Sequence, residues 1–235
     1  MDPEKQNWRC NRANLHLSDM TKWYYIILPP NGIVGLYWRI LKVSKKLFRN
    51  APPGWRIKST KQIYSSDLIK LFEDTLDLDG EDKIYIRAIR RNYSTIVPFI
   101  SENELLVIRS YRHLVDSIQL EAPSGYIEDG ESPDQAAKRE LEEETGYEAK
   151  KIVSLGHYTL DYSMFEQKGN VFAAYDLVNN IEAKSKQSLG KMEKIEVVII
   201  TVEGIKQLLS EGKILNAASI VAFHKALDFH ERYVR

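Results

Sequence analysis

Three glutamates, Glu140, Glu143 and Glu144, have the residue type and spacing in this sequence that are best suited to chemistry. Residues three and four positions apart are neighbours on a helix, so a helix would gather their carboxylates into one patch. Like charges at these positions repel each other, and acids in a last turn oppose the helix dipole, so a compensating cation is expected. Mg²⁺ is commonly held by one or two carboxylates with substrate phosphate and water. Arg139, four residues before Glu143, can pair with that carboxylate and fix its direction.

An isolated run of glutamates is more commonly a solvated helix face, and that interpretation stands beside the metal site. The surrounding pattern favours chemistry. Gly125 is followed after five residues by Glu131, and after seven more by the run from Arg139 to Tyr147. This register defines seven Gly, Glu or Arg positions at once, and a chance match in such a chain is on the order of one in a million.

A helix over residues 133–145 is predicted to position this patch. Ser132 is a good N-cap, Pro133 suits the first helical position, and Gln135 completes a capping box. Gly146 fits the position after the last turn. The apolar residues of the segment are expected to face the core: Ala136, Ala137 and Leu141.

The remaining elements predict a mixed sheet covered by helices. Asp79-Gly80 is a two-residue hairpin signal, and the apolar runs around it favour a meander of short strands. The strand candidates are 84–89, 95–100, 105–108, 152–160, 171–177 and 195–201. Helical spacing is found in 202–210, with Gly212 as a stop, and in 217–229.

Composition excludes several classes of protein. The chain has 235 residues, with 33 basic and 33 acidic side chains, which argues against a dedicated nucleic-acid-binding protein. The single cysteine, Cys10, cannot close an intrachain disulfide, so a reducing, cytoplasmic location is expected. The five histidines lack close metal-ligand spacing, and His224 and His230 are expected on the surface of the terminal helix. Phosphate-loop and dinucleotide-binding glycine motifs are absent from the sequence.

The N-terminal residues 1–54 form a separate, basic and aromatic-rich extension. Residues 1–50 hold nine Lys and Arg against three Asp and Glu. Two short apolar runs flank Pro29-Pro30, so a membrane-spanning helix is not expected, and no signal-peptide cleavage pattern is present. The extension is expected to pack on its own domain or across a dimer, or residues 23–49 are expected to make a peripheral contact with an anionic membrane. Residues 55–235 are predicted to form the main domain.

The stretch from Gly125 to Tyr147 resembles the Nudix box, G-x5-E-x7-R-E-U-x-E-E-x-G-U, at every fixed position, where U is a bulky apolar residue. Resemblance to the Nudix hydrolases implies an α/β fold, an α/β/α sandwich with a mixed β-sheet, and metal-dependent hydrolysis of a nucleoside diphosphate linked to another group. Mg²⁺ is the implied ion, with Mn²⁺ as the alternative. The resemblance assigns Glu140, Glu144 and the carbonyl of Ser124 as metal ligands, Glu143 as a ligand or close support, Arg139 as its orienting partner, Glu131 as the tie between loop and helix, and Gly125 and Gly146 as structural positions.

Outside the box, residues 60–225 resemble the branch of ADP-ribose and nucleotide-sugar pyrophosphatases. Residues 60–90 are similar to its N-terminal hairpin, and the segment around Arg112 to its Q-Y-R motif. The resemblance implies a homodimer in which the hairpin reaches the partner's active site. Arg112 is a candidate for contact with a substrate phosphate, because guanidinium groups suit phosphate oxygens, or it is a surface arginine.

One loop departs from that branch. Its usual proline, about 16 residues past the box glycine, is absent from Thr159 to Glu166. Tyr162 is placed where dinucleoside polyphosphate hydrolases carry a tyrosine, or it packs as a strand residue. Glu166, 22 residues after Glu144, is placed where the branch has its loop carboxylate, and Asp161 is the reserve candidate.

The mechanism predicted from these residues is water attack on a diphosphate. Ions held by Glu140, Glu143 and Glu144 would neutralise phosphoryl charge and orient the water, and Glu166 would take its proton. ADP-ribose or a related nucleotide sugar is the expected substrate, giving a nucleoside monophosphate and a sugar phosphate. A dinucleoside polyphosphate hydrolase and a catalytically silent nucleotide-binding module are the alternatives.

Overall fold

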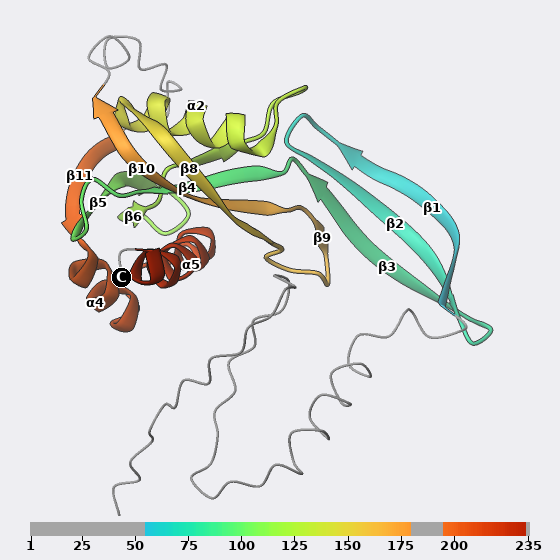
Figure 1. The fold of residues 1–235 in the computed structure, drawn as a ribbon. Coiled ribbons are helices and arrows are strands. Elements are labelled where there is room, and N and C mark those ends of the chain that lie inside the picture. Colours follow the sequence, from blue (N-terminus) through green and yellow to red (C-terminus); the bar gives the residue numbers. More distant parts are fainter. Residues whose placement is uncertain (1–54, 180–194, 234–235) are drawn as a thin grey trace, which may run out of the picture. The chain divides into compact units, whose positions relative to one another are not determined.

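The computed structural model describes residues 55–179 and 195–233 (Figure 1). The predicted extension, including the 23–49 segment assigned to membrane contact, lies outside the described residues, as does Cys10. The first strand begins at Trp55. Within the described residues, no helix is long and apolar enough to span a bilayer.

The N-terminal strands form an antiparallel sheet that a late segment of the chain joins. Strands β1 (Trp55–Ser65), β2 (Ile69–Leu78), β3 (Glu81–Arg90) and β9 (Phe165–Glu166) are hydrogen-bonded in that order. Asp79 and Gly80 connect β2 and β3 with φ angles of 55° and 91°. Such positive φ angles are those of the tight hairpin turn that an Asp-Gly pair favours, so the hairpin prediction is confirmed.

Two further sheets make the body of the domain. One has the order β7 (Ser124–Tyr126), β4 (Tyr93–Pro98), β10 (Gly169–Asn179), β8 (Tyr147–Tyr158), with β4 and β10 parallel. The other has the order β11 (Ile195–Thr201), β5 (Glu104–Arg112), β6 (Ser117–Glu121). The predicted meander is wrong, because β3 and β4 belong to different sheets. Strand β4 is buried along its whole length, and it pairs with β10, which is distant in the sequence, rather than with β3.

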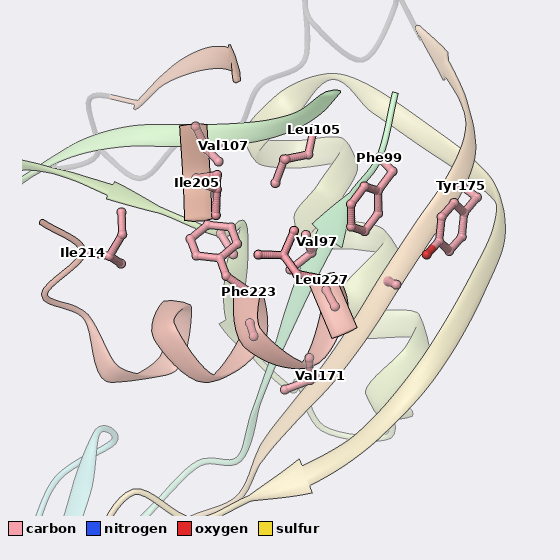
Figure 2. Close-up of a cluster of buried hydrophobic side chains, with 14 residues drawn as sticks. Val97, Phe99, Leu105, Val107, Val171, Tyr175, Ile205, Ile214, Phe223 and Leu227 are labelled. Atoms are coloured by element: carbon pink, nitrogen blue, oxygen red, sulfur yellow. The ribbon is translucent and has the colours of Figure 1, made fainter. Parts of the chain in front are cut away.

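Helices cover both faces of the mixed sheet. The predicted helices are confirmed as α2 (Pro133–Thr145), α4 (Val202–Ser210) and α5 (Ala217–Tyr233), the last extending beyond its expected end. Successive residues of β4 point to opposite faces: Ile96 packs with Leu141 of α2, and Val97 with Phe223 of α5. Figure 1 shows α2 and α5 on opposite sides of the strands, and Figure 2 the larger core around Phe223. The expected α/β/α sandwich is confirmed.

Helix α5 corrects one prediction about the histidines. His224 is exposed as expected, but His230 is buried, with 4% of its surface exposed. Its ring stacks on Phe99 with 3.9 Å between centroids, and its Nε2 lies 2.9 Å from the carbonyl oxygen of Glu102. The helical period alone does not show that the segment just after β4, which carries Phe99 and Glu102, supplies an aromatic and a polar partner to the last turn of α5.

Candidate active site

Local sequence determines where α2 begins and ends. The side chain of Ser132 accepts a hydrogen bond from the backbone N–H of Gln135, and the backbone N–H of Ser132 donates to the side chain of Gln135. Gly146 ends the helix in the left-handed conformation, with a φ of 72°. Ala136, Ala137 and Leu141 are fully buried. The opposite side of the same helix therefore presents its acidic residues to the loops at the end of the sheet.

Arg139 is the centre of the acidic cluster. Its Nε donates to Glu131 Oε1 at 2.9 Å, and its Nη1 donates to Glu140 Oε1 at 2.6 Å and to Glu143 Oε2 at 2.9 Å. Its Nη2 donates to the carbonyl oxygen of Tyr126 at 2.9 Å. The hydrogen bond with Glu131, followed by those with the other carboxylates, raises the pKa of Arg139. One guanidinium thus supplies the positive charge that the repelling carboxylates require.

Glu131 joins the preceding loop to the helix. It also accepts a hydrogen bond from the backbone N–H of Glu128 at 3.0 Å. Its side chain is 14% exposed, and the hydrogen bond from Arg139 lowers its pKa. Arg139 therefore holds the loop through the carboxylate of Glu131 and holds the end of β7 through the carbonyl oxygen of Tyr126. The tie through Glu131 is the one that the family resemblance implies.

Strand β7 touches the cluster directly at Ser124 and Gly125. The backbone N–H of Ser124 donates to Glu144 Oε2 at 2.9 Å. A Cβ atom added to Gly125 would lie 1.9 Å from Glu140 Oε1, well inside van der Waals contact. A side chain at this position would displace the Glu140 carboxylate, because that carboxylate occupies the space that a Cβ atom would fill. Strand β7 and helix α2 thus bring two of the predicted metal ligands, Glu140 and Glu144, against the Ser124–Gly125 backbone.

The donor set has the chemistry of a hard-cation site. Carboxylate oxygens of Glu140, Glu143 and Glu144 beside a backbone segment are the oxygen ligands that Mg²⁺ and Mn²⁺ take. Among residues 55–179 and 195–233, no three His, Cys, Asp or Glu side chains lie in an arrangement that could hold a metal ion. The contacts explain this: Glu140 and Glu143 turn toward Arg139, while Glu144 turns toward Ser124. The residues fit a divalent cation by type and neighbourhood.

A pocket of about 460 Å³ is formed by β3, β9 and the residues that flank β9. Its lining has three cations and one carboxylate, so it favours anionic ligands. The predicted residues Tyr162 and Glu166 both line it, and their exposed fractions are 84% for the residue Tyr162 and 68% for the side chain of Glu166. The charged lining residues are Arg87, Arg90, Glu166 and Lys168.

Arg90 connects this pocket to the acidic cluster. It lines the pocket, and its guanidinium donates to the hydroxyl of Tyr126 and lies 5.8 Å from the centre of that ring. The carbonyl oxygen of Tyr126 in turn accepts from Arg139. Glu166, in contrast, pairs with Arg87, with 3.1 Å between its Oε2 and Nη1 of the arginine. The structure therefore gathers the box residues in one cluster and places Tyr162 and Glu166 in the neighbouring pocket.

Two other predicted residues have local partners. Asp161 Oδ1 accepts from the backbone N–H of Ser163 at 2.7 Å and from its hydroxyl, and these bonds lower the pKa of Asp161, which makes it a weaker base. Arg112 forms two hydrogen bonds, of 2.9 and 2.7 Å, with the buried carboxylate of Glu121. Arg112 is thus tied to β6, the strand that precedes Ser124 in the chain.

Sequence reasoning missed the basic residues on β3. Arg87 lies in the middle of an apolar strand run, and Asp74 is a buried acid on the neighbouring strand, with 2% of its surface exposed. A charged residue inside an apolar run was the available signal. It could not be connected to Glu166, because the parallel pairing of β3 with β9 joins segments about 80 residues apart.

Comparison with known proteins gives consistent matches. Residues 90–218 match the model of the NUDIX domain. An ADP-ribose pyrophosphatase of Bacillus subtilis is 26% identical over 163 residues, which cover 69% of this chain and 86% of that protein. An ADP-sugar pyrophosphatase of Mus musculus is 52% identical over 108 residues, 40% of this chain and 50% of that protein. The crystal structure of an ADP compounds hydrolase aligns with a TM-score of 0.67 at 25% identity, covering 79% of this chain and 98% of that one.

Proposed function

Because this chain belongs to the Nudix family of hydrolases, we propose that it hydrolyses the pyrophosphate bond of a nucleoside diphosphate linked to another moiety. ADP-ribose or a related nucleotide sugar is the proposed substrate, giving a nucleoside monophosphate and a sugar phosphate. The names of the similar proteins support this choice, since they are an ADP-ribose pyrophosphatase, an ADP-sugar pyrophosphatase and an ADP compounds hydrolase.

The observation that carries the proposal is the carboxylate cluster of α2, organised by Arg139 against β7. Glu140, Glu143, Glu144 and the carbonyl oxygen of Ser124 would hold Mg²⁺ or Mn²⁺. A divalent cation, when bound there, supplies charge neutralisation for phosphoryl oxygens and makes a bound water more acidic. Arg139 keeps two of these carboxylates directed and prevents their mutual repulsion from spreading them apart.

The pocket beside the cluster supplies the remaining functions. Arg90 and Lys168 place positive charge where a diphosphate would bind, and Arg90 is already fixed by Tyr126 of the box loop. The rings of Tyr85 and Tyr162 line the same pocket and can contact the faces of a nucleoside base. Glu166 is an exposed carboxylate in this pocket and is proposed to accept the proton of the attacking water.

The proposal is tested by measuring products with the purified full chain. ADP-ribose, other nucleotide sugars and diadenosine polyphosphates are incubated with Mg²⁺, with Mn²⁺, or with a chelator, and products are separated by anion-exchange chromatography. We expect AMP and ribose 5-phosphate from ADP-ribose, and loss of both products with the chelator. Absence of products from every compound with either ion would contradict the proposal.

A second candidate substrate class is the dinucleoside polyphosphates. The specific observation is Tyr162, a residue that is 84% exposed, lines the pocket and has no ring contact with another aromatic side chain among the described residues. Such a ring can stack on a second base. Faster turnover of diadenosine polyphosphates than of ADP-ribose, and its loss in Tyr162→Ala, would favour this class.

A homodimer is proposed on the N-terminal sheet. Every residue of β1 is exposed, including the apolar Trp55, Ile57 and Ile63. An exposed apolar edge strand is typical of a surface that another chain covers. Light scattering during gel filtration measures the mass directly, and a monomer at micromolar concentration would contradict the dimer.

The basic extension is proposed to act as a peripheral contact of a cytoplasmic enzyme with anionic membrane surfaces, or as a packing arm. Sedimentation of the full chain and of residues 51–235 with anionic vesicles separates the two. Preferential sedimentation of the full chain supports membrane contact. Equal sedimentation of both proteins would contradict it.

A further inference from the structure

Glu166 has little to hold it in place by itself. It lies on the two-residue strand β9, and its side chain is 68% exposed. Within the described residues its ion-pair partner is Arg87, whose Nη1 donates to Oε2 at 3.1 Å. An exposed carboxylate on a short strand samples many rotamers, whereas a group that accepts a proton in a transition state must be held near its productive geometry. The ion pair with Arg87 therefore restrains the direction in which the Glu166 side chain points.

Arg87 is held much more firmly than Glu166. Its Nε donates to Oδ2 of Asp74 at 2.6 Å, and its guanidinium carbon lies 4.6 Å from the centre of the Phe72 ring. The side chain of Asp74 is 3% exposed, and its Oδ1 accepts from the hydroxyl of Thr60 at 2.6 Å. A buried carboxylate with an arginine and a hydroxyl partner, beside an aromatic face, makes a rigid mount. Arg87 uses one side of its guanidinium for this mount and the other for Glu166.

Backbone pairing also attaches the segment that carries Glu166 to the N-terminal sheet. Ala88 and Ile89 of β3 pair with Phe165 and Glu166 of β9, and the N–H of Ala88 donates to the carbonyl oxygen of Met164 at 2.8 Å. The loop that carries Tyr162 and Glu166 is therefore attached to the N-terminal sheet rather than to α2. If this attachment positions Glu166, the N-terminal sheet contributes to the active site by holding the residue that is proposed to accept a proton.

We propose that Arg87, mounted on the buried Asp74, is a positioning residue that directs Glu166 into the pocket. This inference rests on the proposed function and deepens it, because it assigns the N-terminal sheet the task of holding the proton acceptor. Thr60 of β1, Asp74 of β2 and Arg87 of β3 form the mount, and Glu166 of β9 is the group that it holds. Arg87 acts through Glu166 and not by contact with the reacting diphosphate.

A double-mutant cycle on turnover distinguishes the two roles of Arg87. Arg87→Gln and Glu166→Gln are each expected to lower kcat by about tenfold or more, with KM changed less than about threefold. The double variant is expected to be no more than about threefold slower than Glu166→Gln alone, because Arg87 has no role without its carboxylate. Multiplication of the two effects, or a rise in KM as the main effect of Arg87→Gln, would overturn the proposal.

Two further variants guard against loss of folding. Arg87→Lys keeps a cation for the buried Asp74, but a single ammonium cannot span both carboxylates in the same way, so its kcat is expected to resemble that of Arg87→Gln. Full activity of Arg87→Lys would show that only charge is needed, against the proposal. Lys83→Gln, which removes an exposed ion pair with Glu81 from the same strand, is the matched control and should keep the activity of the unmodified chain.

Hydrogen exchange tests the mount without any turnover. Peptides covering residues 161–168 are expected to exchange several-fold faster in Arg87→Gln and Asp74→Asn than in Lys83→Gln, because the loop loses its side-chain attachment. Unchanged exchange in both variants would overturn the proposal even if the chain hydrolyses ADP-ribose. Faster exchange in a chain without hydrolytic activity would support the mount and show that only the proposed function had failed.

Discussion

Two arginines organise carboxylates in this domain, and they do so in different ways. Arg139 serves Glu131, Glu140 and Glu143, all of which lie within eight residues of it in the chain. Arg87 serves Asp74 on the neighbouring strand and Glu166, which lies 79 residues away. The first cluster is built on one helix and its preceding loop, whereas the second is assembled from three strands.

The two clusters differ in whether local or long-range contacts position their carboxylates. The Arg139 cluster concentrates negative charge on a helix with strong caps at both ends, so its geometry depends on few long-range contacts. The Arg87 cluster places one exposed carboxylate at the edge of an open pocket, and its geometry depends on sheet pairing. Groups that would hold ions are thus mounted locally, and the group that would move a proton is mounted on a separate sheet.

The largest effect is expected at Glu144. Glu144→Gln removes a proposed metal ligand while the amide oxygen can still accept from the N–H of Ser124. We expect kcat to fall by about 100-fold or more with folding intact. Glu142→Gln, on the same helix at the variable position of the motif, is the control and should stay within about threefold of the unmodified chain. Equal rates for the two variants would remove Glu144 from the site.

Arg139→Gln should show how much the Arg139 cluster contributes to the stability of the fold. It leaves Glu131, Glu140 and Glu143 without their shared cation, and we expect a loss of about 2–3 kcal/mol in the free energy of unfolding. Urea unfolding measures this loss. Arg109→Gln, which breaks the exposed pair with Glu196, should cost no more than about 1 kcal/mol. A loss for Arg139→Gln as small as for Arg109→Gln would mean that the carboxylates do not need the arginine.

Gly125→Ala tests how closely the strand and helix fit. The added Cβ must displace the Glu140 carboxylate, which is the end of a flexible side chain, so stability should change by less than about 1 kcal/mol. Turnover should fall by about tenfold, because a displaced ligand loses its place beside β7. Circular dichroism melting and initial rates measure the two quantities. Full activity would show that Glu140 is not needed at its observed position.

The pH dependence of stability gives the smallest effect. The hydrogen bond from Thr60, then that from Arg87, lowers the pKa of Asp74 from its ordinary 3.8, and the bond from Arg139 lowers that of Glu131 from 4.5. A carboxyl with a lower pKa in the folded state stabilises the fold above its unfolded pKa and loses that stabilisation as the pH falls through the folded pKa. Melting temperatures from pH 7 to pH 3 should therefore fall less steeply in Asp74→Asn than in the unmodified chain. Parallel curves would contradict the role assigned to Asp74.

The same contrast explains what the sequence could predict. Helix α2 was predicted to the residue, because Ser132, Pro133, Gln135 and Gly146 act within one or two turns of the backbone. The N-terminal hairpin was predicted because Asp79-Gly80 is a local turn signal. The carboxylate cluster followed from the helical period and the motif. Contacts within a short stretch of chain are thus readable from residue spacing.

Long-range pairing was not readable in this way. The meander was wrong because β4 pairs with β10, and no residue near β4 announces that partner. His230 was wrongly placed on the surface because its ring partner, Phe99, comes from a distant strand end. Arg87 and Asp74 were missed for the same reason, since their significance depends on β9. The hydrophobic pattern of a single sequence shows that a strand is buried, but it does not show which strand pairs with it.

The proposed activity depends on Glu140, Glu143 and Glu144 holding divalent ions beside the Ser124–Gly125 backbone. Anomalous scattering from Mn²⁺ soaked into crystals of the full chain tests it most directly, because the signal locates the ion without reference to turnover. We expect a peak within coordination distance of Glu140 and Glu144 that disappears in crystals of Glu144→Gln. A peak elsewhere in the domain, with these carboxylates still turned to Arg139 and Ser124, would contradict it.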